Sequence, residues 1–548
     1  MAEGFLEPSS NIGGNERSMV EIGEEYFDSL LWSSFLDGVK KNELDDIVTC
    51  KMHDLVHDLG RDVVGSRECA SANISELENN SDIRRLQFIS DDGLSGRCFK
   101  ALSELKKLRT LMALEPSNNM IGYKFSSNKK LRVLYFGRSA KGCPEVTYPA
   151  ASKLRHLRYF HISGLKLISM HDDESITKLY NLQTLVLSGC ASVHNVLKNM
   201  GSLKNLRFLD ISSSDIKKLP DSVTSLCNLQ RLDLSHCKSL TTFPNSVTCL
   251  KYLKFLVMCF TPIEELPGFI INLANLQTLD VNGCEKLKSL PKNVAGLSNL
   301  RIFEFKNCPL VEALPEDFGA FCQLRSLDLE GTGIKVLPDS CSNLHNLEVL
   351  HLCHCELPRD VKNFTKLKKF RYTYREKTIM PEGVGKLALL QGLIYAVHDK
   401  LINEAECNVG VEELGNLNFL EALDIVNLEN VKDPIDAERA NLKVKQNLRE
   451  LGLCWGKREE ELSAMWWDEN ACNDLQLLKA LQPPPGLIIL GITNFMGSDL
   501  PTWICPSGLP ELAYLRFVNC RGMKQLPASI GKLPRIKYLK LTGISLKS

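Results

Sequence analysis

One short pattern recurs along most of the chain, from about residue 83 onward. The segments "LKNLRFLDIS" (203–212), "LCNLQRLDLSHC" (226–237), "LANLQTLDVNGC" (273–284) and "LHNLEVLHLCHC" (344–355) share one frame of leucines. Copies that follow one another directly begin about 23 or 24 residues apart. A unit this short cannot bury its leucines alone and must stack against its neighbours. The pattern therefore excludes one compact core and predicts an elongated stack of similar turns.

The L-x-x-L-x-L core at this period identifies leucine-rich repeats, in which each copy supplies a short parallel strand and a return segment. We therefore expect an α/β leucine-rich-repeat solenoid (horseshoe) over residues 83–548. The return segments repeat the form L-P-x-x-[IV], as in "KKLPDSV" (217–223) and "KSLPKNV" (288–294). This form lacks the L-x-G-x-[IL]-P pattern of plant extracellular receptor repeats, so it resembles the intracellular subclass.

Several of the 20 cysteines occupy one position of the repeat, three residues after the last apolar residue of the strand. These are Cys190, Cys237, Cys284, Cys308, Cys355 and Cys520. In leucine-rich repeats this position points inward and hydrogen-bonds loop backbone, and a thiol is small, packs well and donates weakly. We expect structural thiols here rather than a metal site or redox chemistry. Without a secretory signal, we also expect them to be reduced.

Composition narrows the classes of partner. Lys plus Arg and Asp plus Glu both number 66, and the formal net charge is +0, so whole-chain charge gives no reason to expect nucleic acid or an anionic membrane as a partner. No stretch approaches the roughly 18 uninterrupted apolar residues of a membrane span. We expect a soluble, cytoplasmic protein with protein partners, no nucleic acid and no membrane span.

The first 68 residues follow a different pattern. Residues 19–36 place apolar side chains near helical spacing, residues 45–53 alternate as in a strand, and residues 53–64 are again amphipathic. A helix, a hairpin and a helix in so short a span predict a partial winged-helix domain over residues 1–68. We expect residues 69–82 to be a linker to the repeats.

Within this region, "CKMHDLVHDLGRDVV" (50–64) places His53 and His57 four residues apart. A zinc protease helix needs H-E-x-x-H with a glutamate as general base. Here Asp54 stands in the glutamate position, one methylene too short, and no third ligand follows at a family spacing. We therefore assign no metal ligand. A plainer alternative is a helix whose polar face carries two histidines.

A third reading rests on resemblance. "MAEGFL" at the start, "CKMHDLVHDLG" (50–60), the L-P-x-x-I repeats and "GVEELGNLNFLEALDIVNLENVKDPIDAERANLKVKQNLRELGLCW" (410–455) resemble the plant nucleotide-binding leucine-rich-repeat disease resistance proteins of the coiled-coil type. The resemblance implies that Met52, His53 and Asp54 are the Met-His-Asp motif that ends the family's winged-helix domain. In that family the histidine contacts the β-phosphate of bound ADP and favours the closed, inactive state. ADP or ATP is thus implied for the full-length family.

The chain also departs from the family pattern. No G-x-x-x-x-G-K-[ST] occurs, so the phosphate cradle and the Mg²⁺-binding hydroxyl of a P-loop are absent, and we expect no cofactor in this chain by itself. Met1 aligns inside the family's winged-helix domain, and Ser548 ends within a repeat. We therefore expect the C-terminal part of a longer protein or a truncated product.

These features predict the recognition and autoinhibitory region of an intracellular plant immune receptor that acts in defense through protein binding. The repeats would bind a pathogen effector or a guarded host protein, and would hold the family's nucleotide-binding domain closed. No residue is expected to be catalytic, so the chain is not expected to be an enzyme. The alternative is a generic intracellular leucine-rich-repeat scaffold without nucleotide linkage.

Strand alternation points to one candidate contact surface. In L-x-L, the residue between the leucines faces the concave side of the solenoid. That position carries Asp210, Asp233, Asp280, Glu304 and Asp328, and further along His351, Arg371, Arg516 and Lys540. Neighbouring strands lie about 4.8 Å apart, so the carboxylates repel one another unless solvent or a basic partner screens them. They are either ordinary solvated repeat residues or a docking strip for a basic surface.

Overall fold

The computed structural model describes residues 2–3, 19–41, 44, 47–59, 69–71, 82–90, 96–116, 127–137, 145–146, 154–164, 166–167, 176, 178–244, 250–292, 294, 296–353, 355–358, 360–373, 382–397, 410–456, 473–523 and 525–544. The chain forms two compact units. Unit 1 comprises Met1–Pro291 and Gly296–Leu310, and unit 2 comprises Lys292–Ala295 and Val311–Ser548.

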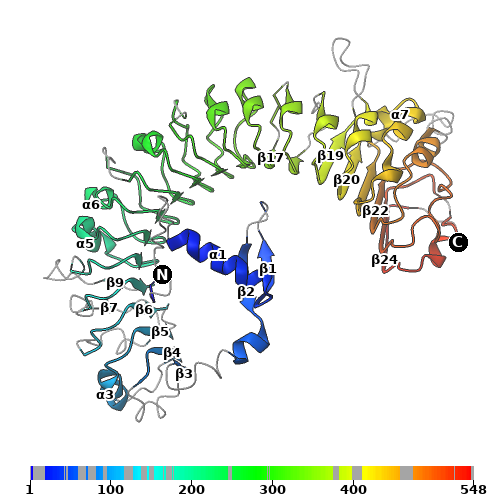
Figure 1. Ribbon diagram of the computed structural model, residues 1–548. Helices are drawn as coiled ribbons and strands as arrows, with labels where there is room; N and C mark the ends of the chain where they lie inside the picture. Colours follow the sequence, from blue (N-terminus) through cyan, green and yellow to red (C-terminus); the bar gives the residue numbers. More distant parts are fainter. Residues whose placement is uncertain are drawn as a thin grey trace, which may run out of the picture. The chain divides into compact units, whose positions relative to one another are not determined.

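Unit 1 begins with a helix and a hairpin. Helix α1 (Met19–Trp32) precedes β1 (Leu36–Lys41) and β2 (Ile47–Met52), which pair antiparallel. Residues 54–59 are again helical. The His53 amide donates to the Phe35 carbonyl at 2.9 Å and so ties the end of β2 to the start of β1. Figure 1 shows α1 next to this hairpin. The expected order of helix, hairpin and helix is confirmed.

The repeats of unit 1 contribute parallel strands to one sheet, each paired with the strand of the next repeat. They are β3 (Cys69–Ser71), β4 (Arg85–Ser90), β5 (Thr110–Glu115), β6 (Val133–Phe136), β8 (Tyr159–Ile162), β10 (Thr184–Val186), β11 (Phe208–Asp210), β12 (Arg231–Asp233), β13 (Phe255–Val257), β14 (Thr278–Asp280) and β15 (Ile302–Glu304). The separate pair β7 (Glu145–Val146) and β9 (Lys166–Leu167) is also parallel. The return segments contain α3 (Gly96–Glu104), α5 (Val193–Leu197), η3 (Met200–Ser202), α6 (Asp221–Thr224) and η4 (Gly268–Asn272).

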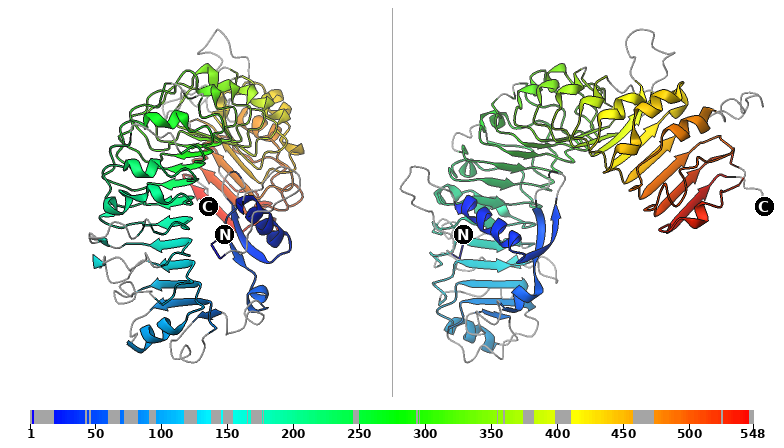
Figure 2. Two further views of the ribbon diagram at one scale, coloured as in Figure 1. Left: turned by 60° about the vertical axis from the view of Figure 1, so that its left-hand side comes forward. Right: turned by 45° about the vertical axis from the view of Figure 1, so that its right-hand side comes forward.

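Unit 2 continues the same repeat plan. Its parallel strands are β16 (Ser326–Asp328), β17 (Val349–Cys353), β18 (Lys369–Thr373), β19 (Gly392–Ala396), β20 (Ala422–Val426), β21 (Glu450–Cys454), β22 (Ile489–Thr493), β23 (Tyr514–Val518) and β24 (Tyr538–Thr542). Its return segments contain η5 (Phe318–Ala320), η6 (Asp339–Asn343), η7 (Val361–Asn363), η8 (Val384–Lys386), η9 (Val411–Asn416), η10 (Leu428–Asn430), α7 (Pro434–Arg439), η11 (Leu442–Val444) and η12 (Ile530–Lys532). Within each unit the helical parts of the return segments lie on the side of the repeats away from the strands (Figure 2).

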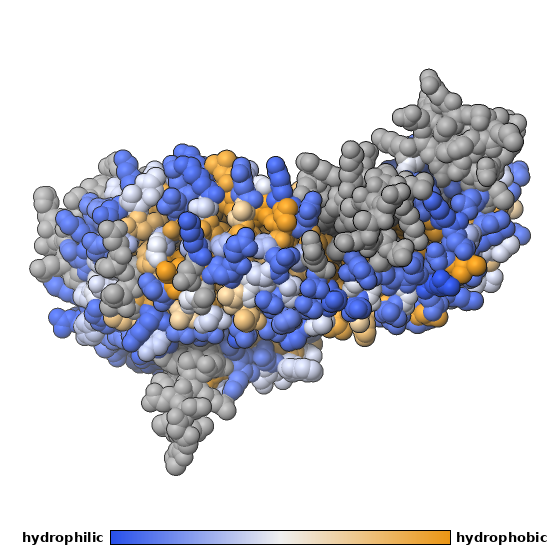
Figure 3. Space-filling view, turned by 90° about the horizontal axis from the view of Figure 1, so that it is seen from above, coloured by the Kyte–Doolittle hydropathy of each residue, from blue (hydrophilic) through white to orange (hydrophobic). Residues whose placement is uncertain are grey.

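The repeat leucines form the core. The central strand leucines stack in register from repeat to repeat and are at most 1% exposed: Leu185, Leu209, Leu232, Leu256 and Leu279. Burying one such side chain contributes about 1.5–3 kcal/mol, but only when both neighbouring repeats are in place. The face drawn in Figure 3 is mostly hydrophilic, with hydrophobic residues in scattered groups. The expected leucine-rich-repeat fold is confirmed.

The cysteine position of the repeat also behaves as expected. The thiols donate to a carbonyl of the preceding repeat: Cys237 to Ile211 at 3.3 Å, Cys284 to Met258 at 3.2 Å, Cys308 to Val281 at 3.3 Å, and Cys190 to Ile162 and Cys520 to Ile492 at 3.6 Å. Cys355 differs, because it donates at 3.6 Å to the carbonyl of Glu356 in its own turn. Burial raises the pKa of Cys308 to about 12, so this thiol keeps the proton that it donates.

A second set of inter-repeat hydrogen bonds was not foreseen. The asparagine that stands two residues after the first leucine of a repeat donates its side-chain amide to a carbonyl one repeat earlier. The pairs are Asn181 with Arg155, Asn205 with Tyr180, Asn228 with Lys204, Asn275 with Lys251, Asn299 with Ala274 and Asn346 with Cys322, at 2.7–2.8 Å. These bonds satisfy loop carbonyls that no strand partner reaches.

The segment expected to be a linker, residues 69–82, contains part of the sheet. Cys69–Ser71 form β3, which pairs parallel with β4. The sheet of the repeats therefore begins before residue 83, where the sequence first shows the leucine frame.

Lys445 occupies a position where the two preceding repeats have Leu387 and Leu417. Its side chain is fully buried, and its Nζ donates to the carbonyls of Leu414, Gly415 and Leu417 at 2.6, 3.3 and 3.1 Å. These carbonyls belong to the end of η9 and the residue after it, where a helix leaves carbonyls without a full set of backbone partners; the Leu414 carbonyl also accepts the Leu417 N–H at 3.1 Å. The lysine thus connects two repeats through backbone rather than through an acidic side chain.

The buried amine predicts a pH dependence of stability. Burial lowers the pKa of Lys445 from 10.5 to about 8. Between these values the unfolded chain holds the proton that the folded chain has released, so the free energy of unfolding should rise with pH in this window. Lys445→Met should abolish this rise, whereas Lys443→Met, at an exposed position of η11, should retain it. Denaturant titrations at pH 7, 8, 9 and 10 measure the difference, and parallel curves for wild type and Lys445→Met would contradict it.

Candidate functional site

The strand residues that face away from the core form columns across the sheet. In unit 1 the pairing aligns Asp210 with Asp233 and Asp280 with Glu304, and Val257 stands between the two pairs. In unit 2 Asp328 is aligned with His351. Within each unit, the expected acidic residues do stand at the equivalent position of each strand, between the two core residues. Whether they bind a partner remains a prediction.

Each aspartate is held by the turn that follows its strand. Its Oδ1 accepts the backbone N–H two residues further on: Ser212 to Asp210, Ser235 to Asp233, Asn282 to Asp280 and Glu330 to Asp328, at 2.9–3.1 Å. Three residues after each aspartate the backbone enters the left-handed region, at Ser213, His236, Gly283 and Gly331. Short acidic side chains favour such turns because they replace a backbone acceptor. The carboxylates therefore build the turns as well as facing outward.

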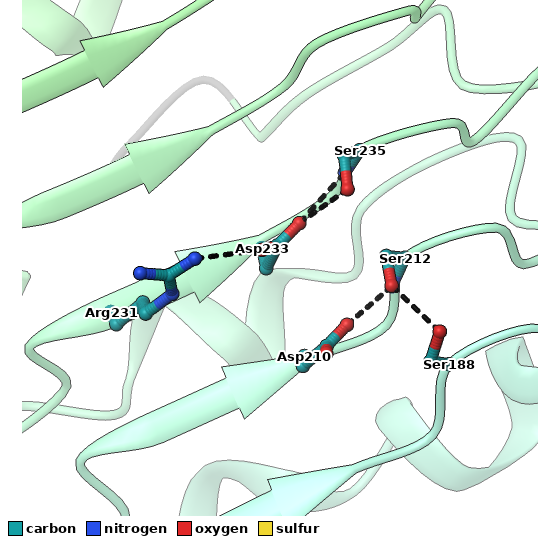
Figure 4. A network of polar contacts seen from close by, with 6 residues as sticks. All are labelled: Ser188, Asp210, Ser212, Arg231, Asp233 and Ser235. Carbon is teal, nitrogen blue, oxygen red and sulfur yellow. Dashed lines mark hydrogen bonds and ion pairs between the residues drawn. The ribbon is translucent and has the colours of Figure 1, made fainter. Parts of the chain in front are cut away.

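Neighbouring polar groups extend this arrangement (Figure 4). Asp233 also accepts from the Ser235 hydroxyl at 2.6 Å and from Arg231 Nη2 at 3.1 Å. The Ser212 hydroxyl lies 2.8 Å from that of Ser188 in the preceding repeat. Part of the negative charge is thus already paired, and the carboxylates are held in fixed orientations.

Asp328 differs from the partner-facing carboxylate that we expected. Its Oδ2 lies 3.2 Å from Nδ1 of His351, and the two side chains are only 12% and 6% exposed. Both residues stand in the column expected from the sequence, but their pairing was not foreseen. One oxygen of Asp328 is thus engaged across β16 and β17, as one oxygen of Asp233, whose side chain is 13% exposed, is engaged by Arg231 along β12.

The charge of Asp280 is disfavoured by its surroundings. Burial raises the pKa of this carboxyl, and the nearby Asp233 raises it further, although the Asn282 N–H opposes the shift. The acidic column is therefore a place where added positive charge stabilises the ionised form.

An aromatic group adjoins the acidic column in unit 1 and was missed by the sequence analysis. The rings of Tyr135 and His161 lie 4.3 Å apart, and Tyr159 is nearly parallel to His161 at 6.5 Å. Burial lowers the pKa of His161 although Asp210 acts in the opposite direction. Reading the same strand positions in "LRVLYFG" and "LRYFHIS" would have identified these rings.

The Met-His-Asp segment lies where β2 meets the short helix. Met52 ends β2 and is 52% exposed, and Asp54 is exposed as well. His53 Nδ1 accepts the Leu55 N–H at 3.3 Å, so the ring caps the helical residues 54–59. His53 therefore precedes the helix rather than sharing a helical face with His57.

The arrangement of these side chains limits the metal ions and phosphates that the segment could bind. Among the described residues, no cluster of three or more His, Cys, Asp or Glu could hold a metal ion. With Nδ1 engaged in the cap, His53 offers Nε2 to a phosphate oxygen, whereas a diphosphate requires several converging donors. The His53 ring supplies one such donor. In the part of the chain that the structure describes, no helix is long and apolar enough to span a membrane.

Family comparisons agree with this organisation. The "Disease resistance protein Winged helix domain" matches residues 1–60, a "Leucine-rich repeat region" matches residues 185–259, and "R13L1/DRL21 LRRs" match residues 411–544. Among solved structures, the leucine-rich-repeat protein LIC12759 of Leptospira interrogans has a TM-score of 0.52 at 19% identity and covers 87% of this chain and 95% of its own. A TDR receptor also has a TM-score of 0.52, at 21% identity, covering 77% and 70%. These two structures support the fold alone.

Curated relatives point to one group of proteins. Disease resistance protein RGA2 of Solanum bulbocastanum is 34% identical over 129 residues, which are 24% of this chain and 12% of that protein. Disease resistance protein RPP13 of Arabidopsis thaliana is 27% identical over 195 residues, which are 34% of this chain and 21% of that protein. The chain thus spans a small part of these relatives. The resemblance to plant disease resistance proteins is confirmed.

The double role of the aspartates predicts how substitutions affect stability. Asp280→Asn keeps an acceptor for the Asn282 N–H. It also removes the carboxyl group, whose pKa is raised from 3.8 by burial. Because the folded pKa is raised, wild type loses stability relative to the Asn variant as pH rises through it. At pH 7 Asp280→Asn should therefore equal or exceed wild type, whereas Asp280→Ala should lose about 0.5–1.5 kcal/mol. Denaturant unfolding of both variants measures this, and equal losses for Asn and Ala would contradict it.

Proposed function

We propose that this chain is the recognition and autoinhibitory region of an intracellular plant immune receptor, acting in the cytoplasm by binding proteins and not by catalysis. The disease-resistance winged-helix and repeat matches support the family context. The observation that carries the proposal is the outward column of unit 1, where Asp210, Asp233 and Asp280 are fixed by hydrogen bonds to their own turns.

Fixed carboxylates suit recognition of a basic surface. A side chain already held in one orientation loses little conformational entropy when a partner binds. The partly buried charge of Asp280 would also be stabilised by an approaching Lys or Arg, because its pKa is raised by burial and by Asp233. The partner is a pathogen effector, a guarded host protein or the nucleotide-binding domain of the receptor itself.

The Met-His-Asp segment would supply the autoinhibitory contact. Joined to a nucleotide-binding domain that holds ADP, His53 would add one hydrogen bond to a phosphate oxygen through Nε2. Such a contact can bias a two-state equilibrium only by its differential energy, about 1–3 kcal/mol for a charge-assisted bond. A generic protein-binding scaffold remains the second candidate, and it would show no response to nucleotide in any context.

Association with a nucleotide-binding domain tests the acidic column. We expect Asp233→Asn with Asp280→Asn to weaken binding of this chain to the nucleotide-binding domain of a disease resistance relative, supplied separately, by about tenfold at low salt. The difference should shrink at high salt, because exposed charges are screened. The matched control is Asp221→Asn with Glu265→Gln, which removes two exposed charges of unit 1 outside the column. Equal affinities for the two double variants, by calorimetry, would refute the role of the column.

Nucleotide binding tests the role of His53. The chain alone should show no heat of binding with ADP or ATP up to millimolar concentration, because one ring nitrogen cannot replace a phosphate-binding loop. A dissociation constant in the micromolar range would contradict this. In a chain joined to the upstream domains, His53→Ala should raise basal signalling, and unchanged signalling would count against the autoinhibitory contact.

A further inference from the structure

In unit 2, an aromatic and basic group lies on the strand face of β23 and β24. The rings of Tyr514 and Tyr538 stack, with centroids 4.7 Å apart and planes at 11°, and the two residues are 43% and 60% exposed. Arg516 and Lys540 are aligned beside them, and both are exposed. Within the described part of unit 2, no acidic side chain forms an ion pair with either cation. Tyr and Arg are enriched at the centres of protein interfaces.

The same face becomes acidic two and three strands away. Register aligns Glu450 with Ile489 and Tyr514, so an exposed carboxylate stands in the column of the tyrosines. In the column of Arg516, Asp424 stands on β20, and its carboxylate lies over Gly452 on β21, where an added Cβ would meet Oδ1 at 1.9 Å. Charge therefore changes sign along this face, from acidic at β20 and β21 to basic at β23 and β24.

Gly491 on β22 leaves space between these charges. A Cβ added at this position would meet nothing within 4 Å, and its neighbours in register are Gly452 and Arg516. A glycine weakens a strand and often marks a place where a ligand or another backbone approaches closely. The space above Gly491 is thus bordered by a carboxylate on one side and a guanidinium on the other.

We propose that the strand face of β20–β24 binds an extended protein segment that carries an acidic side chain over β23–β24 and a basic side chain over β20–β21. The inference deepens the proposed function, since it rests on protein binding by the repeats and names the chemistry of the bound segment. Three strand steps of about 4.8 Å separate Asp424 from Arg516, and an extended chain advances about 3.3 Å per residue. The acidic and basic residues of the bound segment are therefore about four positions apart, with a residue between them over Gly491.

The alternative occupant, single-stranded nucleic acid, fits this face less well. Bases could stack on the tyrosines and phosphates could pair with Arg516 and Lys540. A single-stranded nucleic acid that continued toward β21 and β20 would bring its phosphates close to Glu450 and Asp424, and these carboxylates would repel the phosphates. A segment with charges of both signs satisfies both ends of the face.

A selection experiment with matched variants tests the proposal. A random dodecapeptide phage library is selected on the full-length wild-type chain, and enriched peptides are synthesised and measured by fluorescence anisotropy. We expect enriched sequences to contain an acidic and a basic residue about four positions apart. Gly491→Val, which fills the open space, and Arg516→Glu should each weaken binding at least tenfold. The control Gly531→Val lies on η12, where an added Cβ also meets nothing within 4 Å, and should bind as wild type does.

The variants separate binding from folding. Valine favours strands, so Gly491→Val should melt at or above the temperature of wild type. Absence of enriched peptides, enrichment without the charge order, or unchanged binding by Gly491→Val would each overturn the proposal. Tight binding of a single-stranded oligonucleotide that is lost in Arg516→Glu would assign the face to nucleic acid instead. The test uses no nucleotide-binding domain, so failure of the acidic column in unit 1 and failure of this face are distinguishable.

Discussion

Every turn of this protein depends on the turn beside it. A strand such as Thr184–Val186 has three residues and cannot persist alone, but its backbone pairs with a strand on each side and its leucine packs between two others. Cysteine and asparagine side chains repeat the same dependence in the loops, since Cys284 and Asn275 each donate to a carbonyl of the preceding repeat. Backbone, core and loop interactions therefore keep one common register along each unit.

That register is the part of the structure most readily predicted. The leucine period placed Asp210, Asp233 and Asp280 at equivalent strand positions, and the pairing agrees. The hydrogen bond from each aspartate to its own turn was not predicted, because it depends on a left-handed residue three positions later, which several residue types supply. β3 was missed because three residues without the leucine frame carry no periodic signal. Lys445 was missed for the opposite reason, since a charged residue in a leucine position does not suggest burial.

The outward strand positions serve two purposes at once. Asp233 orders the turn after β12 and also stands in the outward column with its side chain 13% exposed, and Arg231 on the same strand moderates its charge. Substitution at such a position changes both the turn and the surface, so recognition cannot vary freely there. Positions such as Gly491, where added atoms meet nothing, are free of that constraint. A surface made mainly of positions like Gly491 can change its binding specificity with little effect on the fold.

The buried thiols determine how the protein meets oxidants. Oxidation and disulfide exchange proceed through the thiolate. Burial raises the pKa of Cys308, Cys341 and Cys355 to about 12, so these sulfurs stay protonated and shielded at neutral pH. Among the described cysteines, Cys322 is exposed, and Cys505 has a pKa lowered by hydrogen bonds from Ser507 and Gly508. A peroxide pulse would therefore modify these outer sulfurs first, while the thiols that join the repeats stay reduced and the stack keeps its shape.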